Sequence, residues 1–318
     1  GLADKASSTP VNTASRFRIA SVSKPITAVA IYKLIEMGAF DLADTVFGTG
    51  GILGTTYGTQ PYKTDVENIT LQHLLEHTSG LPTNDSTDPM FQNNTMSQAQ
   101  VITHTLDNRD LLFSPGSDYR YSNVGYCVLG RVIEDATGQP YETWVQQNIL
   151  GPCGISSMEI GGNTLTDRLP NEVVYYPDSG STYGMNVSRM DSHGGWIATA
   201  ADIVRFTVHV NGMGGKPDLL PDRRIRAVGL RFALLERESH RNLEGQGAGS
   251  GGSACRSSRT RARTASSTES SGMHARPSPN GPPTPARNAG SAICSAPPRG
   301  DNTTPKRNAD RKSTRLNS

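Results

Sequence analysis

The chain has 318 residues, a formal net charge of +2, four cysteines and 6% aromatic residues. Residues 1–222 hold 13 Lys/Arg against 23 Asp/Glu, whereas residues 223–318 hold 18 Lys/Arg against 6 Asp/Glu. No aromatic residue follows Phe232, and 30 of the 78 residues from Arg241 onward are Ser, Gly or Pro. Such a segment lacks the apolar surface that offsets chain entropy, which excludes one globule of the full length. We predict an acidic folded domain over residues 1–222 and a basic, disordered tail over residues 223–318.

Apolar periodicity predicts the elements of the first domain in chain order. A short alternating stretch at residues 17–21 is followed by apolar residues at helical spacing over residues 22–37, and Gly38 ends this helix. Thr70 is the expected N-cap of a short helix over residues 71–75. We expect further helices over residues 97–112, 123–137, 141–150 and 200–209, strand character near residues 173–176, and one strand or helical turn over residues 226–235.

Composition also argues against several other classes of protein. No run approaches the ~20 apolar residues of a membrane helix, because Thr27, Lys33 and Glu36 interrupt the longest apolar stretch. The cysteines show no CxxC spacing, so the sequence predicts neither a zinc site nor a disulfide scaffold, and no cofactor. The chain begins at Gly1 without a signal peptide, so we expect that an N-terminal part is missing.

The first candidate for chemistry is the segment Ser21-Val-Ser-Lys24 at the start of the predicted helix. A serine hydroxyl is a poor nucleophile without a base, and a lysine three residues on lies on the same helix face. The positive end of the helix favours both an alkoxide and a neutral amine. The spacing therefore predicts Ser21 as a nucleophile and Lys24 as its base. The alternative is a capping serine beside a surface lysine.

The second candidate is Tyr121-Ser-Asn123, which precedes the predicted helix over residues 123–137. A phenol and a carboxamide two residues apart in a turn can face one site. The phenol can relay a proton to a leaving group, and the amide can hold a substrate carbonyl or a lysine. The alternative is an ordinary turn. The two motifs together, in this order and about 100 residues apart, favour a catalytic site.

Four segments, taken in order, resemble those of one known family. They read FRIASVSK (residues 17–24), ITLQHLLEHTSGLP (69–82), PGSDYRYSN (115–123) and GGWIATAAD (194–202). The chain resembles the serine β-lactamase-like superfamily, in particular its class C β-lactamases, serine esterases and D-Ala-D-Ala or D-amino-acid peptidases. The resemblance implies an α+β fold of the β-lactamase/transpeptidase type, of which we expect mostly the helical part with an incomplete antiparallel sheet.

The resemblance also implies a role for each candidate residue. Ser21 would be the acylated nucleophile, and its backbone N–H would be one half of an oxyanion hole. Lys24 would be the base partner of Ser21, and Tyr121 the general base or acid. Asn123 would position the carbonyl of an ester, amide or β-lactam substrate. No metal or organic cofactor is implied, and export to the periplasm or beyond is the expected localisation.

Other polar residues near these motifs have a simpler interpretation. His77 is not the expected base, because the family does not use histidine in this role, and we expect His73 and His77 to pack against or cap the short helix. Ser79 and Ser122 are expected to be turn residues. The choice among lactamase, esterase and peptidase stays open, as does the oligomeric state.

The family's third motif, Lys-Thr-Gly or His-x-Gly on a strand, has no clear counterpart. His193-Gly-Gly195 fits His-x-Gly formally, but the residues after it place it in the earlier glycine segment. The rival hypothesis is therefore a non-catalytic remnant of the same fold that lacks a complete oxyanion hole, since each lost oxyanion donor typically costs about 10²–10³ in rate.

The basic tail has three interpretations. Its composition is typical of a frameshifted or chimeric sequence beginning near residue 222, and residues 310–318 resemble a translated sequencing adapter. A basic arm for an anionic membrane or for nucleic acid is the alternative. Since the tail lacks the aromatic residues that stack on single-stranded bases, no nucleic-acid partner is expected.

Overall fold

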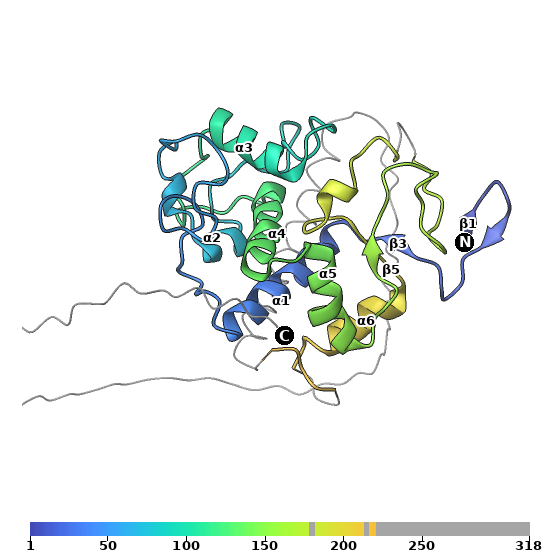
Figure 1. The fold of residues 1–318 in the computed structure, drawn as a ribbon. Helices are drawn as coiled ribbons and strands as arrows, with labels where there is room; N and C mark the ends of the chain where they lie inside the picture. Colours follow the sequence, from blue (N-terminus) through green and yellow to red (C-terminus); the bar gives the residue numbers. More distant parts are fainter. Residues whose placement is uncertain (178–181, 213–215, 221–318) are drawn as a thin grey trace, which may run out of the picture. The chain divides into compact units, whose positions relative to one another are not determined.

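The structure is a computed structural model and describes residues 1–177, 182–212 and 216–220 (Figure 1). The α-helices described are α1 (Ser23–Glu36), α2 (Leu71–Leu75), α3 (Gln98–Asn108), α4 (Asn123–Thr137), α5 (Tyr141–Val145) and α6 (Ala200–Val208). The strands described are β1 (Leu2–Asp4), β2 (Thr9–Pro10), β3 (Phe17–Arg18), β4 (Glu159–Ile160) and β5 (Trp196–Ala198). Short helical turns lie at η1 (Ala20–Val22), η2 (Val66–Asn68), η3 (Gln146–Leu150), η4 (Gly151–Cys153) and η5 (Ser188–Met190). The predicted domain boundary after residue 222, the predicted element at 226–235 and the tail lie outside the described residues.

Helix α1 forms the centre of the core. It packs against α4, α5 and the π-helical turn η3 (Figure 1). Of its 14 residues, 11 are buried, and Ile26, Val29 and Ile31 are at most 1% exposed, as expected for a helix packed on most of its circumference. Lys24 is equally buried on this helix, which singles it out as a polar residue that needs partners.

Side-chain caps fix where the predicted helices begin. Capping boxes pair Thr70 with His73 at α2, Ser97 with Gln100 at α3, and Thr199 with Asp202 at α6. Helix α4 ends at Gly138, whose φ of 65° is readily adopted only by glycine. Because these signals are local, the predicted helices at residues 71–75, 123–137 and 200–209 agree with the structure to within one residue.

A small antiparallel sheet ties the start of α1 to the segment before α6. Strand β5 lies between β3 and β4, with Phe17 opposite Ala198 and Glu159 opposite Ile197. Trp196 is completely buried, so this sheet packs directly on the core. Strands β1 and β2 form a separate two-stranded sheet. The described residues therefore have the predicted mixed α+β architecture, with helices predominating over small antiparallel sheets.

Two predicted elements differ from the structure. The helix expected over residues 97–112 ends at Asn108, because Arg109 is already extended with φ of −123°. The strand character expected near residues 173–176 is limited to an isolated parallel bridge between Arg16 and Glu172, beside which Val173 N donates to Arg16 O. The Arg18 N–H, which could have continued this pairing, instead donates to the Tyr175 hydroxyl at 2.8 Å. A side chain thus takes the place of a strand partner.

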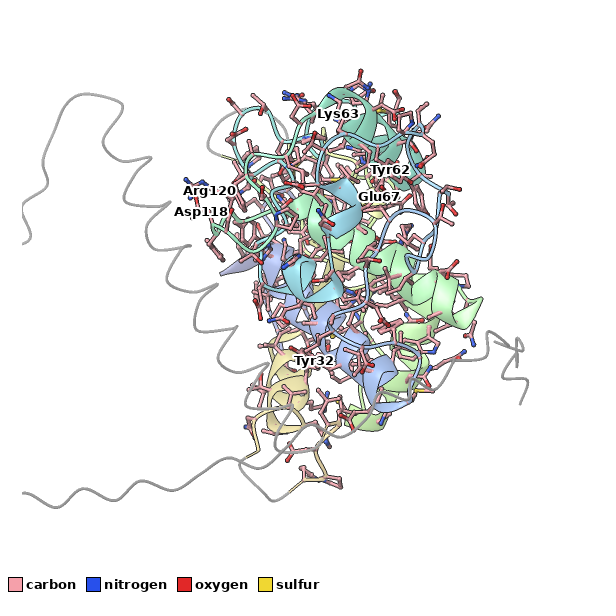
Figure 2. All side chains as sticks on the ribbon, turned by 90° about the vertical axis from the view of Figure 1, so that its left-hand side faces the viewer. Tyr32, Tyr62, Lys63, Glu67, Asp118 and Arg120 are labelled. Carbon is pink, nitrogen blue, oxygen red and sulfur yellow. The ribbon has the colours of Figure 1, made fainter. Side chains whose placement is uncertain are left out.

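Figure 2 contrasts exposed charged side chains with a buried aromatic one. Figure 2 labels Asp118 and Arg120, an ion pair of 3.2 Å in which both side chains are about half exposed, whereas Tyr32 is completely buried in α1. Among the described residues, none of the helices combines the length and the apolar character needed to cross a bilayer.

Candidate active site

The backbone before Ser21 is unusual. Ile19 N donates to Trp196 O at 3.0 Å, which ties this turn to β5. The next residue, Ala20, has a φ of 45°, a left-handed conformation that is costly for a residue with a Cβ. The turn η1 then places Ser21 in an exposed position, while Lys24, one helical turn further, is fully buried. Such a strained conformation persists only where the surrounding structure imposes it. Around Ala20, that structure is the sheet of β3, β5 and β4 together with helix α1.

Lys24 is surrounded by three acceptors. Its Nζ atom lies 2.7 Å from Asn123 Oδ1, 2.8 Å from the His193 carbonyl oxygen and 3.3 Å from Ser21 Oγ. A neutral amine has two N–H groups and one lone pair. If the two shorter contacts take the two hydrogens, the lone pair is left facing the Ser21 hydroxyl. The geometry therefore suits an amine that accepts the serine proton.

Burial also lowers the pKa of the Lys24 amine. Enclosure in the core lowers the pKa of Lys24 from 10.5 to about 7, while the nearby Asp88 carboxylate acts in the opposite direction. A charged amine loses its hydration in such a place, which favours the neutral form. Near neutral pH, a substantial fraction of Lys24 is thus unprotonated and able to act as a base.

Tyr121 contacts the same serine from the other side. Its hydroxyl donates to Ser21 Oγ at 2.6 Å, and Lys24 Nζ lies 4.7 Å from the centre of its ring. The Tyr121 carbonyl accepts from Asn84 N and from the Thr83 hydroxyl, so the segment before α4 is held in place. The structure therefore brings the phenol predicted from the second motif to the serine of the first.

Asn123 lies behind Lys24 and is almost completely buried. Its Oδ1 atom accepts from Lys24, and its Nδ2 donates to Asp88 Oδ2 at 2.8 Å and to Asn84 Oδ1 at 3.2 Å. Both amide hydrogens are thus used within the protein. The predicted contact of Asn123 with a substrate carbonyl would require the longer bond, to Asn84, to be exchanged.

The two histidines of the 69–82 segment make structural contacts around α2 and the segment before α4. His73 completes the cap of α2, with its Nδ1 accepting from Thr70 N. His77 Nδ1 accepts from Ser122 N, and burial lowers the pKa of His77 well below its ordinary value. His77 thus packs as a neutral ring, in agreement with the predicted packing and capping roles.

The two other serines named as turn residues also have structural partners. Ser122 Oγ accepts from Gly125 N at the start of α4, and Ser79 Oγ accepts from Leu81 N. Both side chains are buried, whereas Ser21 is exposed.

The segment 191–195 supplies a carbonyl to the site. Arg131 of α4 pairs with Asp191, and His193 O accepts from Lys24. Gly195 lies so close to the turn η5 that a Cβ there would be 2.9 Å from Val187 O, which explains the glycine. The capped helix α6 follows, as predicted for the glycine-then-helix segment, whereas the intervening strand β5 was not predicted.

Sequence reasoning missed Asp88 and Asn84, the two partners of the Asn123 amide. Both lie in a polar stretch, residues 83–94, that shows no periodicity. Nothing in its pattern separates Asp88 from Asp85. Only the three-dimensional structure does so, because Asp88 is completely buried and Asp85 is exposed.

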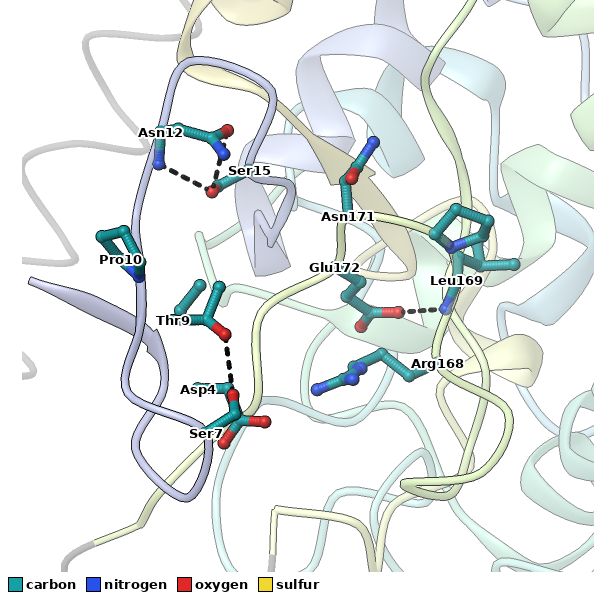
Figure 3. A pocket seen from close by; sticks show the side chains of 12 residues that line it. Asp4, Ser7, Thr9, Pro10, Asn12, Ser15, Arg168, Leu169, Asn171 and Glu172 are labelled. Carbon is teal, nitrogen blue, oxygen red and sulfur yellow. Dashed lines mark hydrogen bonds between the residues drawn. The ribbon is translucent and has the colours of Figure 1, made fainter.

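A separate hollow lies beside the N-terminal hairpin, away from the four candidate residues. It has a volume of about 530 Å³ and is lined by residues of the 3–15 and 168–172 segments, including Asp4, Arg168 and Glu172 (Figure 3). Glu172 accepts from Leu169 N at its edge. In the described part of the chain, no three or more His, Cys, Asp or Glu side chains are arranged to bind a metal ion.

Comparison with known proteins gives a consistent result. The sequence model of a family described as beta-lactamase matches residues 1–252. Penicillin-binding protein 4* of Bacillus subtilis (strain 168) is 32% identical over 181 residues, which cover 55% of this chain and 37% of that protein. Protein flp of Staphylococcus aureus (strain MRSA252) is 29% identical over 168 residues, covering 53% of this chain and 32% of that protein. The chain thus spans about a third of the length of these curated relatives.

Solved structures resemble the described fold. The penicillin-binding protein from Bacillus halodurans has a TM-score of 0.57 at 25% identity, covering 71% of this chain and 68% of that chain. The D-amino acid amidase from Ochrobactrum anthropi SV3, in its complex with L-phenylalanine, has a TM-score of 0.58 at 25% identity, covering 71% of this chain and 62% of that chain.

Proposed function

Since the chain belongs to the beta-lactamase family of serine hydrolases, we propose that Ser21 attacks the carbonyl carbon of a small-molecule ester, amide or β-lactam and becomes acylated. The observation that carries the proposal is the arrangement around one atom. Ser21 Oγ lies 3.3 Å from Lys24 Nζ and 2.6 Å from the Tyr121 hydroxyl, with a buried amine on one side and a phenol on the other.

Acylation moves one proton and exchanges one bond. As Ser21 Oγ bonds to the carbonyl carbon, the neutral Lys24 amine takes the serine proton. The bond from the carbonyl carbon to the leaving nitrogen or oxygen then breaks. Tyr121 donates its proton to that leaving group and is reprotonated from the Lys24 ammonium, whose Nζ lies 4.7 Å from its ring centre. Lys24 ends the step as a neutral amine.

Deacylation uses the same groups with water as the nucleophile. Tyr121 and Lys24 remove a proton from water as it attacks the acyl carbon, and the same groups return a proton to Ser21 Oγ when the ester bond breaks. The backbone N–H of Ser21 is proposed as one oxyanion donor, because N–H groups in the first turn of a helix have no partner within it. Asn123 is proposed to hold the substrate carbonyl by exchanging its bond to Asn84.

A covalent probe tests this function on the full chain. The protein is incubated with a fluorescent fluorophosphonate or a labelled penicillin, and labelling is followed by gel fluorescence and by mass spectrometry of the modified peptide. We expect labelling at Ser21 and its loss in Ser21→Ala. Ser86→Ala, which changes an exposed serine outside the site, should label like the wild type. Labelling that persists in Ser21→Ala would rule the proposal out.

The rival of a non-catalytic remnant makes the opposite prediction. It rests on the sequence, which contains no Lys-Thr-Gly or Lys-Ser-Gly. A folded sample that neither probe labels at Ser21 would favour this rival. Comparing the penicillin with an activated ester and a D-amino acid amide then distinguishes among the three substrate classes.

A further inference from the structure

Asp88 is a buried carboxylate in a stretch of mostly exposed residues. Its side chain is completely inaccessible, whereas residues 84–87 and 91–95 are exposed. Burying a carboxylate is costly unless hydrogen bonds or a charge compensate for the lost hydration. An aspartate in an ordinary surface turn stays exposed and avoids this desolvation cost. The partners of the two Asp88 oxygens therefore indicate the role of this residue.

Each carboxylate oxygen of Asp88 has one defined partner. Oδ1 accepts from Met90 N at 2.8 Å, which closes a local turn, and Oδ2 accepts from Asn123 Nδ2 at 2.8 Å. The buried Arg189 guanidinium donates to the carbonyls of Met90, Asn93 and Met96, which anchors the loop that carries Asp88. The carboxylate is therefore held in one orientation.

This orientation decides which way the Asn123 amide faces. An ionised carboxylate can only accept hydrogen bonds, so the Asn123 atom opposite Asp88 must be the donor, Nδ2. Oδ1 is then forced to the other side, where it accepts from Lys24 Nζ at 2.7 Å. In the reversed orientation, the amide would present N–H groups to the lysine and an oxygen to the carboxylate, and both contacts would be lost.

The charges of Asp88 and Lys24 support the same arrangement as their hydrogen bonds. The charge of Asp88 favours the protonated form of Lys24. Burial raises the pKa of Asp88, while the hydrogen bonds from Asn123 and Met90 N and the charge of Lys24 act in the opposite direction. The other titratable groups that face Lys24 are Tyr121, Tyr126, His77 and His193. Burial and the lysine charge lower the pKa of both histidines well below the ordinary value, so they are neutral. Asp88 is the carboxylate in this set.

We infer that Asp88 is a positioning residue for the acyl-serine chemistry proposed above, on which this role rests: its carboxylate, held by Met90 N and Asn123 Nδ2, turns the Asn123 oxygen toward Lys24. The Asp88 carboxylate accepts hydrogen bonds from Met90 N and Asn123 Nδ2. It acts through the amide of Asn123, so its effect is to set the pH range in which Lys24 is an available base.

Replacing Asp88 by asparagine should shift the titration of Lys24 in a predictable direction. The new carboxamide has one oxygen for two donors, Met90 N and Asn123 Nδ2, and it carries no charge. If its oxygen pairs with Asn123, the attraction on the lysine proton disappears. If its oxygen pairs with Met90, the Asn123 amide is driven to reverse and present N–H groups to Lys24. Either arrangement weakens proton binding by Lys24, so its titration moves to lower pH.

Two readouts test the inference on the full chain. The first is the fluorophosphonate labelling rate as a function of pH, in the wild type and in Asp88→Asn. The second is the pH titration of the Asn123 side-chain amide signals in ¹⁵N NMR, which does not depend on catalysis. We expect the midpoint of both to fall by about one pH unit in Asp88→Asn. Asp85→Asn removes an exposed carboxylate of the same stretch and is the matched control, so its midpoint should equal that of the wild type.

The outcomes separate the inference from the proposed function. Midpoints in Asp88→Asn that equal those of the wild type in both readouts would overturn the role of Asp88. A wild type that is never labelled but shows the NMR shift would overturn the acyl-serine proposal and leave the effect of Asp88 on Lys24 intact. If Asp88→Asn does not fold, Asp88→Ser, which keeps an acceptor for Asn123, should show the same downward shift and replaces it.

Discussion

The ring of His77 lies against the ring of Tyr121, with centroids 4.5 Å apart and planes tilted by 33°. His77 also contacts the ring of Tyr126, with centroids 5.0 Å apart. A neutral imidazole packed against two phenol rings is a rigid support, and its Nδ1 also accepts from the Ser122 backbone N–H. The segment that carries His77 is therefore connected to the candidate site through the position of Tyr121.

The pH dependence of labelling should report Lys24. Burial lowers the pKa of this lysine to about 7, and only its neutral form can accept the Ser21 proton. The fluorophosphonate labelling rate, corrected for hydrolysis of the probe, should therefore rise with pH to a plateau with a midpoint near 7. Lys24→Arg, which stays protonated, should be labelled slowly at every pH. A wild-type midpoint near 4 would instead point to a carboxylate as the base.

The same lysine should make folding stability depend on pH. The unfolded chain holds the lysine proton up to a pKa of about 10.5, whereas the folded chain releases it near 7. Between these values the unfolded state binds more protons, so the free energy of unfolding rises with pH. Relative to Lys24→Met, which cannot titrate, the wild type should gain about 2 kcal/mol between pH 7 and pH 9. Urea unfolding of both proteins at the two pH values measures this. An unchanged difference would contradict the lowered pKa.

Removing the phenol hydroxyl should affect rate more than folding. Tyr121→Phe deletes the hydrogen bond to Ser21 Oγ but keeps the ring beside His77. We expect labelling to slow by about 10²–10⁴, the usual contribution of a general acid or base. Tyr126→Phe is the matched control, because its hydroxyl donates to Leu75 O at 3.2 Å, away from Ser21. That variant should keep its labelling rate within a few-fold and lose about 1 kcal/mol of stability. Equal rates for both variants would exclude the proposed role of Tyr121.

Two glycines of α4 should respond in opposite ways to alanine. A Cβ on Gly130 would lie 2.5 Å from Ser192 Oγ, next to the His193 carbonyl that accepts from Lys24. Gly130→Ala should cost about 1–3 kcal/mol and slow labelling by pushing that segment away. A Cβ on Gly125 would meet nothing closer than 3.6 Å, so Gly125→Ala should be neutral or stabilise the helix by up to about 1 kcal/mol. Thermal unfolding of the pair tests the packing, and similar melting temperatures would contradict it.

The helices could be predicted from the sequence because their signals are local. Thr70 and Thr199 cap helices whose apolar faces are read from neighbouring residues, and Ser21 and Lys24 are one helical turn apart. The strand character expected near residues 173–176 is limited to a single bridge, because the Arg18 N–H that could extend the pairing donates to the Tyr175 hydroxyl. Such a contact links residues that are distant in sequence, and no local pattern encodes it.

The candidate site could likewise be predicted only in part. The pairing of Tyr121 with Ser21 was expected from family resemblance, since nothing in spacing alone brings together residues 100 positions apart. Asp88 was missed because its role depends on burial, and a polar loop shows no periodicity from which burial could be read. The hydrogen-bond partners of a buried amide are set by the tertiary fold alone.

The complete enclosure of Lys24 also has a protective effect. A deprotonated amine at physiological pH would ordinarily react with aldehydes, carbon dioxide and other electrophiles that are present in any cell. The Lys24 side chain has no exposed surface, which limits the access of such reagents to its amine. The packing that strips the amine of its proton therefore also shields it, and its lone pair is left for the one hydroxyl that lies beside it.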